Sequence, residues 1–204
     1  MTTPDQTVFV VDDDDAVRQS LALLIRSMGL VAEVFESAQA FLAVCDAQRG
    51  GCLLLDIRMP GMSGLELQEE LQRRAIDLPV IFITGHGDVA MAVRAMKSGA
   101  VDFIEKPFND QQLLDRINQS LEIDRAARNA RAERSSLAAR IELLSPRERE
   151  VMARIVAGQA NKAVAIELGL SERTVEIHRA KVMTKIGARS LAELVTLVNR
   201  YGEA

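Results

Sequence analysis

The sequence predicts a doubly wound α/β domain with a five-stranded parallel sheet, followed by a small all-α domain. Up to residue 124, short apolar runs alternate with helical patterns, whereas the last third holds only consecutive short helical patterns. Charge divides the chain at the same place. Residues 1–124 carry 10 Lys and Arg against 20 Asp and Glu, a net of −10, and residues 125–204 carry 15 against 9, a net of +6. This asymmetry indicates two domains with different partners, the second suited to a polyanion.

Five apolar runs in the first half have the length and composition of buried strands: Val8–Val11, Val31–Phe35, Cys52–Leu55, Val80–Ile83 and Val101–Ile104. Between them, apolar residues recur at helical spacing in residues 17–28 and 89–96. Ser63 and Glu66 form a capping-box pattern that begins another helix, and Gly99 follows the helix of residues 89–96. Strands this apolar, separated by helices, predict a parallel sheet covered on both faces.

Polar side chains follow four of these runs, at the edge of such a sheet where ligands bind: Asp12–Asp15, Asp56, Thr84 and Lys106. Asp12, Asp13 and Asp56 would repel one another unless a cation lay among them, and an all-oxygen site favours Mg²⁺. Lys106 adds a positive charge, and Thr84 adds a hydroxyl donor suited to a phosphoryl oxygen. The last two aspartates of the first group have a simpler explanation as N-caps of the first helix.

No apolar run is long enough to cross a bilayer, so no membrane association is expected. Residues 1–6 show no basic segment followed by an apolar stretch, and we therefore expect no secretory signal. Cys45 and Cys52 lie among apolar neighbours without metal-ligand spacing. Free thiols in a reducing cytoplasm are the expectation.

The second half predicts helices throughout. Residues 125–140 are rich in Arg and Ala and contain neither Gly nor Pro, which favours a helical linker, with a dimerising helix as the alternative. Ser145–Glu148 combines a serine cap, a proline at the first helical position and a capping-box glutamate. Asn161–Leu168 and Ser171–Ile186 then predict two helices separated by a short turn. Such a helix-turn-helix can place its second helix in the major groove of DNA.

Four segments of the first domain resemble the receiver domain of two-component response regulators: Val8–Asp13, Leu55–Gly64, Thr84–His86 and Lys106–Phe108. The resemblance spans about residues 5–124 and implies a flavodoxin-like sheet with strand order 2-1-3-4-5. By this resemblance, Asp56 accepts a phosphoryl group from a sensor histidine kinase, and Lys106 pairs with that group. Asp13 would bind Mg²⁺ directly and Asp12 through water, while the carbonyl of Arg58 completes the protein ligands.

The same resemblance implies a cis Lys106–Pro107 bond and a switch pair, in which the Thr84 hydroxyl moves toward the phosphoryl group and the Phe103 ring turns inward. Phosphotransferases and phosphatases that form an aspartyl phosphate typically carry a second acid two residues after the nucleophile. Arg58 fills that position here, so a dedicated hydrolase is disfavoured. Self-phosphorylation from small donors and autodephosphorylation are the only catalysis expected, and His86 and Arg58 flank the site where they would influence the second.

In the second domain, Leu144–Val151, Asn161–Lys162 and Leu170–His178 resemble the DNA-binding domain of the NarL/FixJ (LuxR-type) regulators. The implied organisation is a receiver domain over 1–124, a helical linker over 125–140 and a DNA-binding domain over 141–204. This combination is similar to the FixJ branch, which includes regulators of nitrogen fixation and of aromatic catabolism.

The resemblance implies that the helix from Thr174 to Ile186 contacts promoter DNA. Base contacts are expected from Glu176, Ile177 and Ala180, and phosphate or groove contacts from Thr174, Lys162, His178, Arg179, Lys181 and Lys185. Glu176 departs from the basic residue that many such regulators carry there. A glutamate can accept a hydrogen bond from cytosine but repels phosphate. Val175, Val182 and Ile186 have core spacing, and the two lysines of this helix have a solvated face as their alternative role.

These features predict a transcription regulator in which phosphorylation of Asp56 promotes homodimerisation and binding to promoter DNA, with RNA polymerase as a further candidate partner. The alternative is a receiver-based interaction protein whose output domain binds a protein rather than specific DNA.

Overall fold

The computed structural model describes residues 6–85 and 89–201, apart from the side chain of Tyr201. Contacts divide the chain into two compact units, Met1–Arg128 and Asn129–Ala204. The division falls inside the segment expected to be a linker. Residues 125–140 are helical throughout and belong to one helix, α5 (Asp110–Glu142).

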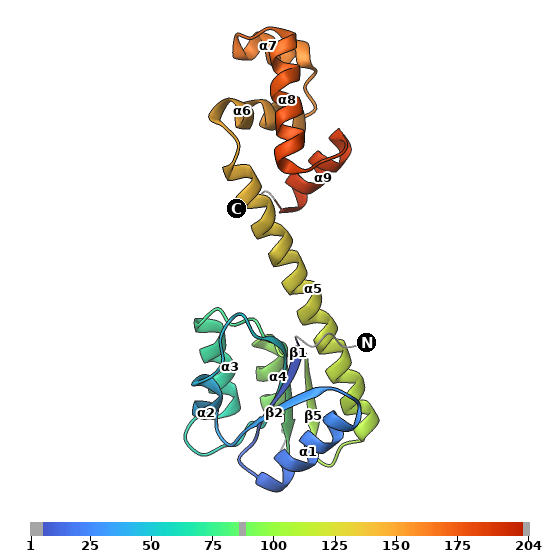
Figure 1. Ribbon diagram of the computed structural model, residues 1–204. Coiled ribbons are helices and arrows are strands. Elements are labelled where there is room, and N and C mark those ends of the chain that lie inside the picture. The colour runs from blue at the N-terminus through green and yellow to red at the C-terminus, as the bar shows by residue number, and fades with distance from the viewer. Residues whose placement is uncertain (1–5, 86–88, 202–204) are drawn as a thin grey trace. The chain divides into compact units, whose positions relative to one another are not determined.

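The first unit is a sheet flanked by helices (Figure 1). Its five parallel strands lie in the order β2-β1-β3-β4-β5, which confirms the predicted class and strand order. Its strands are β1 (Gln6–Val11), β2 (Val31–Phe35), β3 (Gly50–Leu55), β4 (Val80–Thr84) and β5 (Asp102–Glu105). Its helices, besides the first part of α5, are α1 (Asp15–Ser27), α2 (Ala38–Leu42), α3 (Gly64–Arg73) and α4 (Val89–Lys97). The sequence patterns did not predict α2, a short helix capped by the Ser37 hydroxyl.

Alternate residues of the central strands enter two separate cores. On β1, Phe9 and Val11 pack with side chains from α2, α3 and α4, whereas Val8 and Val10 pack with side chains from α1 and α5. The strands are therefore covered on both faces, as their apolar composition predicts. Polar side chains therefore lie at the ends of the strands, and the candidate site lies at the carboxyl end of the sheet.

The receiver portion of α5 is tied to the amino end of the sheet by a buried carboxylate. Asp124 Oδ2 accepts hydrogen bonds from the Gly51 amide at 2.9 Å and from Gln6 Nε2 at 3.0 Å. Gln6 Nε2 also donates to the Leu121 carbonyl at 2.6 Å. These bonds satisfy groups that would otherwise be buried without partners, and they fix α5 against β1 and β3.

In the described part of the second unit, turns and loops join helices and no strand is present, which confirms the all-α prediction. After the end of α5 come α6 (Pro146–Val156), α7 (Asn161–Leu168), α8 (Glu172–Ile186) and α9 (Leu191–Tyr201). Both predicted hydrogen bonds of the Ser145–Glu148 capping box are present, Gly169 closes α7 in the left-handed conformation, and Ser171 caps α8. Leu137 of α5 lies in the core of this unit with Val151, Val164, Val182 and Leu194.

Across residues 6–85 and 89–201, every helix is too short or too polar to pass through a lipid bilayer. Both cysteines are free thiols, Cys45 half-buried and Cys52 buried. Burial raises the pKa of Cys45 to about 11 and raises the pKa of Cys52 as well. Both side chains therefore remain protonated at neutral pH.

Candidate functional site

Three of the predicted side chains meet at the carboxyl edge of the sheet. Lys106 Nζ lies 2.6 Å from Asp12 Oδ2 and 3.2 Å from Asp56 Oδ1. Both carboxylates are buried, with 3% of Asp12 and 7% of Asp56 exposed. The topology produces this cluster because β1, β3 and β5 end at one edge of the same sheet.

The loop after β1 is held by short-range hydrogen bonds. Asp12 Oδ1 accepts from the Asp14 amide at 2.9 Å, and Asp14 Oδ1 accepts from the Ala16 amide at 2.8 Å as the N-cap of α1. Arg18 reaches back from α1 and donates to the Asp12 carbonyl at 2.7 Å and to Asp15 Oδ1 at 2.9 Å. Asp14 therefore has the capping role expected for it, and Arg18 is a contributor that the sequence patterns did not reveal.

The loop after β3 approaches the start of α3 very closely. The Gly64 amide donates to the Ile57 carbonyl at 3.0 Å, and a Cβ at Gly64 would lie 2.2 Å from the Asp56 carbonyl oxygen. Glycine is thus required for close approach at this position. Asp56 Oδ2 accepts from the Arg58 amide at 2.7 Å, so both carboxylate oxygens of Asp56 have defined partners.

The electrostatics of the cluster leave an excess of negative charge. Burial raises the pKa of Asp56, the neighbouring Asp12 raises it further, and Lys106 opposes both effects. Burial would lower the pKa of Lys106, but its hydrogen bond and charge interaction with Asp12 outweigh this and the pKa is raised. One ammonium therefore faces two carboxylates in a partly desolvated pocket, which favours binding of an additional cation.

The three carboxylates expected around a cation are not gathered into one cluster. Among residues 6–85 and 89–201, no group of three or more His, Cys, Asp or Glu side chains is placed to hold a metal ion, and Asp13 is exposed. The Lys106 ammonium contacts both Asp12 and Asp56 and reduces the repulsion between them. The remaining donors are oxygens with net negative charge, a set that fits a hard divalent cation such as Mg²⁺.

The expected switch residues lie on neighbouring strands. Thr84 ends β4 and is 1% exposed, and its carbonyl accepts from the Lys106 amide at 2.8 Å. Phe103, on β5, is half-buried against the core that contains α3 and α4. The Lys106–Pro107 peptide bond is cis, as expected. Arg58 is exposed, and His86 lies outside the described residues.

In the second unit, α7 and α8 form the predicted helix-turn-helix. Val175, Val182 and Ile186 of α8 are fully buried, which confirms their assignment to the core. The opposite side of the helix carries four exposed residues predicted to contact DNA: Glu176, Ile177, Ala180 and Lys181. Lys162 of α7 is also exposed. We call α8 the recognition helix from here on.

The other predicted DNA contacts have partners within the unit or are partly covered. The Thr174 hydroxyl lies 2.8 Å from the Ser171 hydroxyl, and Arg179 Nη1 donates to Asn161 Oδ1 at 3.2 Å. His178 is half-buried, and its Nδ1 has no hydrogen-bond partner among the residues that the structure describes. Lys185 forms an ion pair with Glu148 at 2.7 Å. Lys185 is itself exposed, so its ion pair, and not burial, distinguishes it from Glu176, Ile177, Ala180 and Lys181.

Two family models match the chain and together cover most of it. The model described as response regulator receiver domain matches residues 8–118, and the model described as bacterial regulatory proteins, luxR family, matches residues 142–198. The matches correspond to the two structural units, with the junction in α5 outside both.

Relatives match the chain over nearly its whole length. Nodulation protein W of Bradyrhizobium diazoefficiens is 51% identical over 96% of this chain and 86% of that protein. Transcriptional regulatory protein FixJ of Rhizobium meliloti is 48% identical over 95% of each chain. Among solved structures, the response regulator StyR is similar with a TM-score of 0.88 and 48% identity, covering 97% of this chain and 100% of that one. The chain therefore belongs to the two-component response regulators that join a receiver domain to a LuxR-type DNA-binding domain, as FixJ does.

Proposed function

We propose that a sensor histidine kinase phosphorylates Asp56 and that phosphorylation promotes pairing of two copies of this chain on promoter DNA to control transcription. The observation that carries the proposal is the Asp12–Asp56–Lys106 cluster, because it combines a carboxylate nucleophile with a fixed positive charge. In the transfer, the bond between phosphorus and the kinase histidine breaks and a bond between phosphorus and an Asp56 oxygen forms. Phosphoryl transfer needs little protein chemistry beyond positioning and charge stabilisation.

The residues of the site divide these tasks. Lys106 holds Asp56 in place before transfer and can neutralise a phosphoryl oxygen afterwards. Asp12 and Asp13, with Asp56 and the Arg58 carbonyl, are the oxygens that would hold Mg²⁺. When bound, the ion would supply positive charge to the equatorial phosphoryl oxygens. Thr84 would bring its hydroxyl to the new phosphoryl group, with Phe103 moving inward beside it.

The pairing surface that we propose is the face formed by α4, β5 and the first part of α5. Three apolar side chains of α4 are exposed on the described surface: Val89, Val93 and Met96. Exposed apolar side chains on one helix are typical of a protein interface. Pairing through this face would bring two recognition helices to neighbouring half-sites, where each strengthens the binding of the other.

The relatives suggest the kind of process controlled. FixJ is named as a transcriptional regulatory protein, and NodW as a nodulation protein. For this chain we propose regulation of a metabolic or symbiotic operon from the cytoplasm. The recognition helix would contact DNA bases, and the chain would contact RNA polymerase at the promoter. Binding of the second unit to a protein instead of DNA is the outcome that would replace this proposal.

Incubation with acetyl phosphate and Mg²⁺, followed by intact-mass measurement, tests the first step. The wild-type chain should gain one phosphoryl group and Asp56→Asn should gain none. Sedimentation and DNA titration, with and without acetyl phosphate, test the second step. Equal phosphoryl uptake by Asp56→Asn would reject the phosphorylation site, and a wild-type chain that stays monomeric and binds DNA equally in both states would reject the pairing mechanism.

A further inference from the structure

The last turn of the recognition helix is bonded to the first turn of α6 and to the segment before it. Lys185 Nζ donates to Glu148 Oε2 at 2.7 Å and to the Leu143 carbonyl at 3.0 Å. Glu148 is 4% exposed, and its Oε2 also accepts from the Ser145 amide at 2.8 Å. One buried carboxylate therefore completes the cap of α6 and binds the end of α8.

The charge of Glu148 is firmly held in this arrangement. The hydrogen bond from Lys185, followed by that from the Ser145 amide, lowers the pKa of Glu148 to about 2. Removal of the Lys185 ammonium would leave a buried carboxylate without its cation, which is more costly than loss of an exposed ion pair. Both lysines of α8 are exposed, but Lys185 has a structural partner that Lys181 lacks within the described residues.

A second tie comes from α5. Arg140 Nη1 donates to the Ile186 carbonyl at 2.9 Å, where the last carbonyls of a helix lack partners within the helix and a cation is favoured. Gly187 follows with φ of 77°, and a Cβ there would lie 3.2 Å from Arg140 Nη1. The guanidinium thus lies directly beside the end of the recognition helix.

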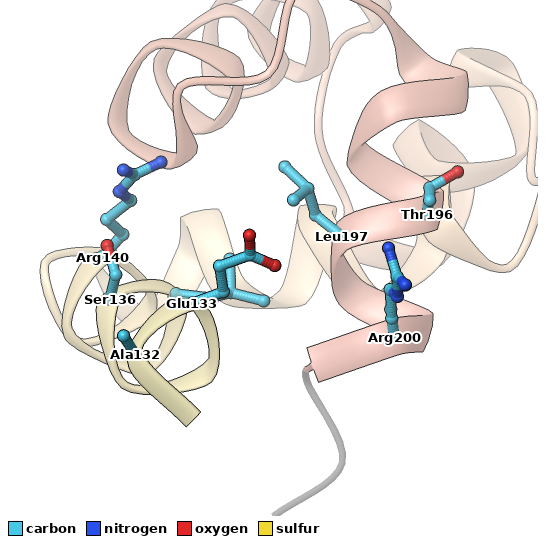
Figure 2. Close-up of a pocket in the computed structure, with 8 residues that line it drawn as sticks. Ala132, Glu133, Ser136, Arg140, Thr196, Leu197 and Arg200 are labelled. Atoms are coloured by element: carbon cyan, nitrogen blue, oxygen red, sulfur yellow. The ribbon is translucent and has the colours of Figure 1, made fainter. Parts of the chain in front are cut away.

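The end of α5 is also part of the packing of this unit. Leu137 is 3% exposed within the core that contains Ile186. Figure 2 shows Arg140 and Ser136 of α5 across a groove from Leu197 and Arg200 of α9. The volume of this groove is about 500 Å³. Residues 137–141 lie before the start of the LuxR-family match at residue 142, yet they contact the core and the recognition helix.

We infer that Arg140 and Lys185 are positioning residues that fix the C-terminal end of the recognition helix, so that the end of α5 is part of the DNA-reading unit. The Lys185 ammonium accordingly donates to Glu148 and to the Leu143 carbonyl and does not contact DNA phosphate. This role for Arg140 and Lys185 rests on the proposed function, in which the exposed residues Glu176, Ile177, Ala180 and Lys181 make the DNA contacts.

The orientation of the helix matters because its base-reading residues are far from this end. Glu176 is ten residues before Ile186, which corresponds to roughly 15 Å along a helix. A tilt of about 10° around the C-terminal end would move Glu176 by roughly 2.6 Å, enough to break a hydrogen bond to a base edge. Contacts with phosphate oxygens tolerate such a displacement better than base contacts do, because long cationic side chains can follow it and no base geometry is matched. Loss of the ties should therefore reduce specificity more than overall affinity.

The test uses the full chain with acetyl phosphate and two DNA duplexes of equal length. One is selected by the wild-type chain from a randomised library, and the other is unrelated. Lys185→Ala and Arg140→Gln should bind the selected duplex on the order of tenfold more weakly while binding to the unrelated duplex changes little. Their dependence of log affinity on log salt should equal that of the wild type. Lys181→Ala is the matched control and should reduce that slope by about 0.9, the value for one phosphate contact.

Each other result overturns the inference. A slope reduced by about 0.9 in Lys185→Ala, with both duplexes weakened equally, would identify Lys185 as a phosphate contact. Unchanged binding in both variants would show that the ties do not orient the helix. If Lys185→Ala does not fold, Lys185→Gln and Arg140→Gln give the same comparison. Failure of the wild-type chain to prefer any duplex would instead reject the DNA-binding proposal, so the two failures are distinguishable.

Discussion

Replacement of Gly64 by alanine should distort the phosphorylation site from the backbone side. The added Cβ would lie 2.2 Å from the Asp56 carbonyl oxygen, whereas real Cβ contacts are essentially never under 3.0 Å. The Asp56 peptide or the start of α3 must therefore move by about 0.8 Å. Overpacking of this kind costs about 1–3 kcal/mol. For a domain of this size, that corresponds to a fall in Tm of about 4–12 °C.

The same displacement should slow phosphorylation, because Asp56 carries the carboxylate that must align with the phosphodonor. A misplacement of about 1 Å can cost about a hundredfold in rate. Calorimetry of the receiver transition and the rate of phosphoryl uptake from acetyl phosphate measure the two effects. Gly85→Ala is the control, since a Cβ there meets no atom of the described residues within 4 Å. A Gly64→Ala chain with wild-type Tm and wild-type uptake would refute the argument from close approach.

Three further predictions concern stability. Burial raises the pKa of Asp56 above its ordinary value of 3.8, so the folded chain binds the carboxyl proton of Asp56 more tightly than the unfolded chain does. The folded chain therefore loses stability as the pH rises above 3.8. Asp56→Asn should therefore be more stable than the wild type at about pH 7 in urea titrations, and a difference that does not shrink on acidification would contradict this. The pKa of Glu148 is lowered from 4.5 to about 2. The charged Glu148 side chain therefore stabilises the fold fully above pH 4.5, and this stabilisation is lost as the pH falls from 4.5 toward 2. Thermal unfolding at each pH should show this loss in the wild type and in the control Glu150→Gln but not in Glu148→Gln. Leu137→Ala should destabilise the second unit by about 2–5 kcal/mol, while the exposed Leu143→Ala stays within about 0.5 kcal/mol in the same calorimetric transition.

The sequence was most informative where a feature depends on local pattern. Apolar runs, helical spacing and caps such as Ser63 and Ser145 have causes within a few residues, and the structure has the strands and helices at those positions. The carboxyl-edge cluster was predictable for a related reason. Once a sheet is known to be parallel, the residues after its strands must meet at one edge, which places Asp12, Asp56 and Lys106 together.

Features that depend on the packing of elements distant in the sequence could not be predicted from it in the same way. The Lys106 ammonium contacts both Asp12 and Asp56 while Asp13 is exposed, and this depends on the conformation of the loops that follow β1, β3 and β5. The five residues of the short helix α2 are too few to show a helical periodicity in the sequence. The hydrogen bond of Arg18 to the Asp12 carbonyl joins an ordinary helix-surface residue to a backbone atom, and no spacing rule identifies such a pair.

The net charge of +6 in the last 80 residues shows why charge counts alone do not locate a DNA-binding face. Several basic side chains of this region are paired within the unit: Arg147 with Glu150, Arg154 with Glu167 and Lys185 with Glu148. These pairs contribute to the count of basic residues but provide little charge for a phosphate backbone. Lys162 and Lys181 are exposed and have no ion pair within the described residues, and they lie on the two helices of the helix-turn-helix. The electrostatic part of DNA binding should therefore follow these two lysines more closely than it follows the overall charge of the domain.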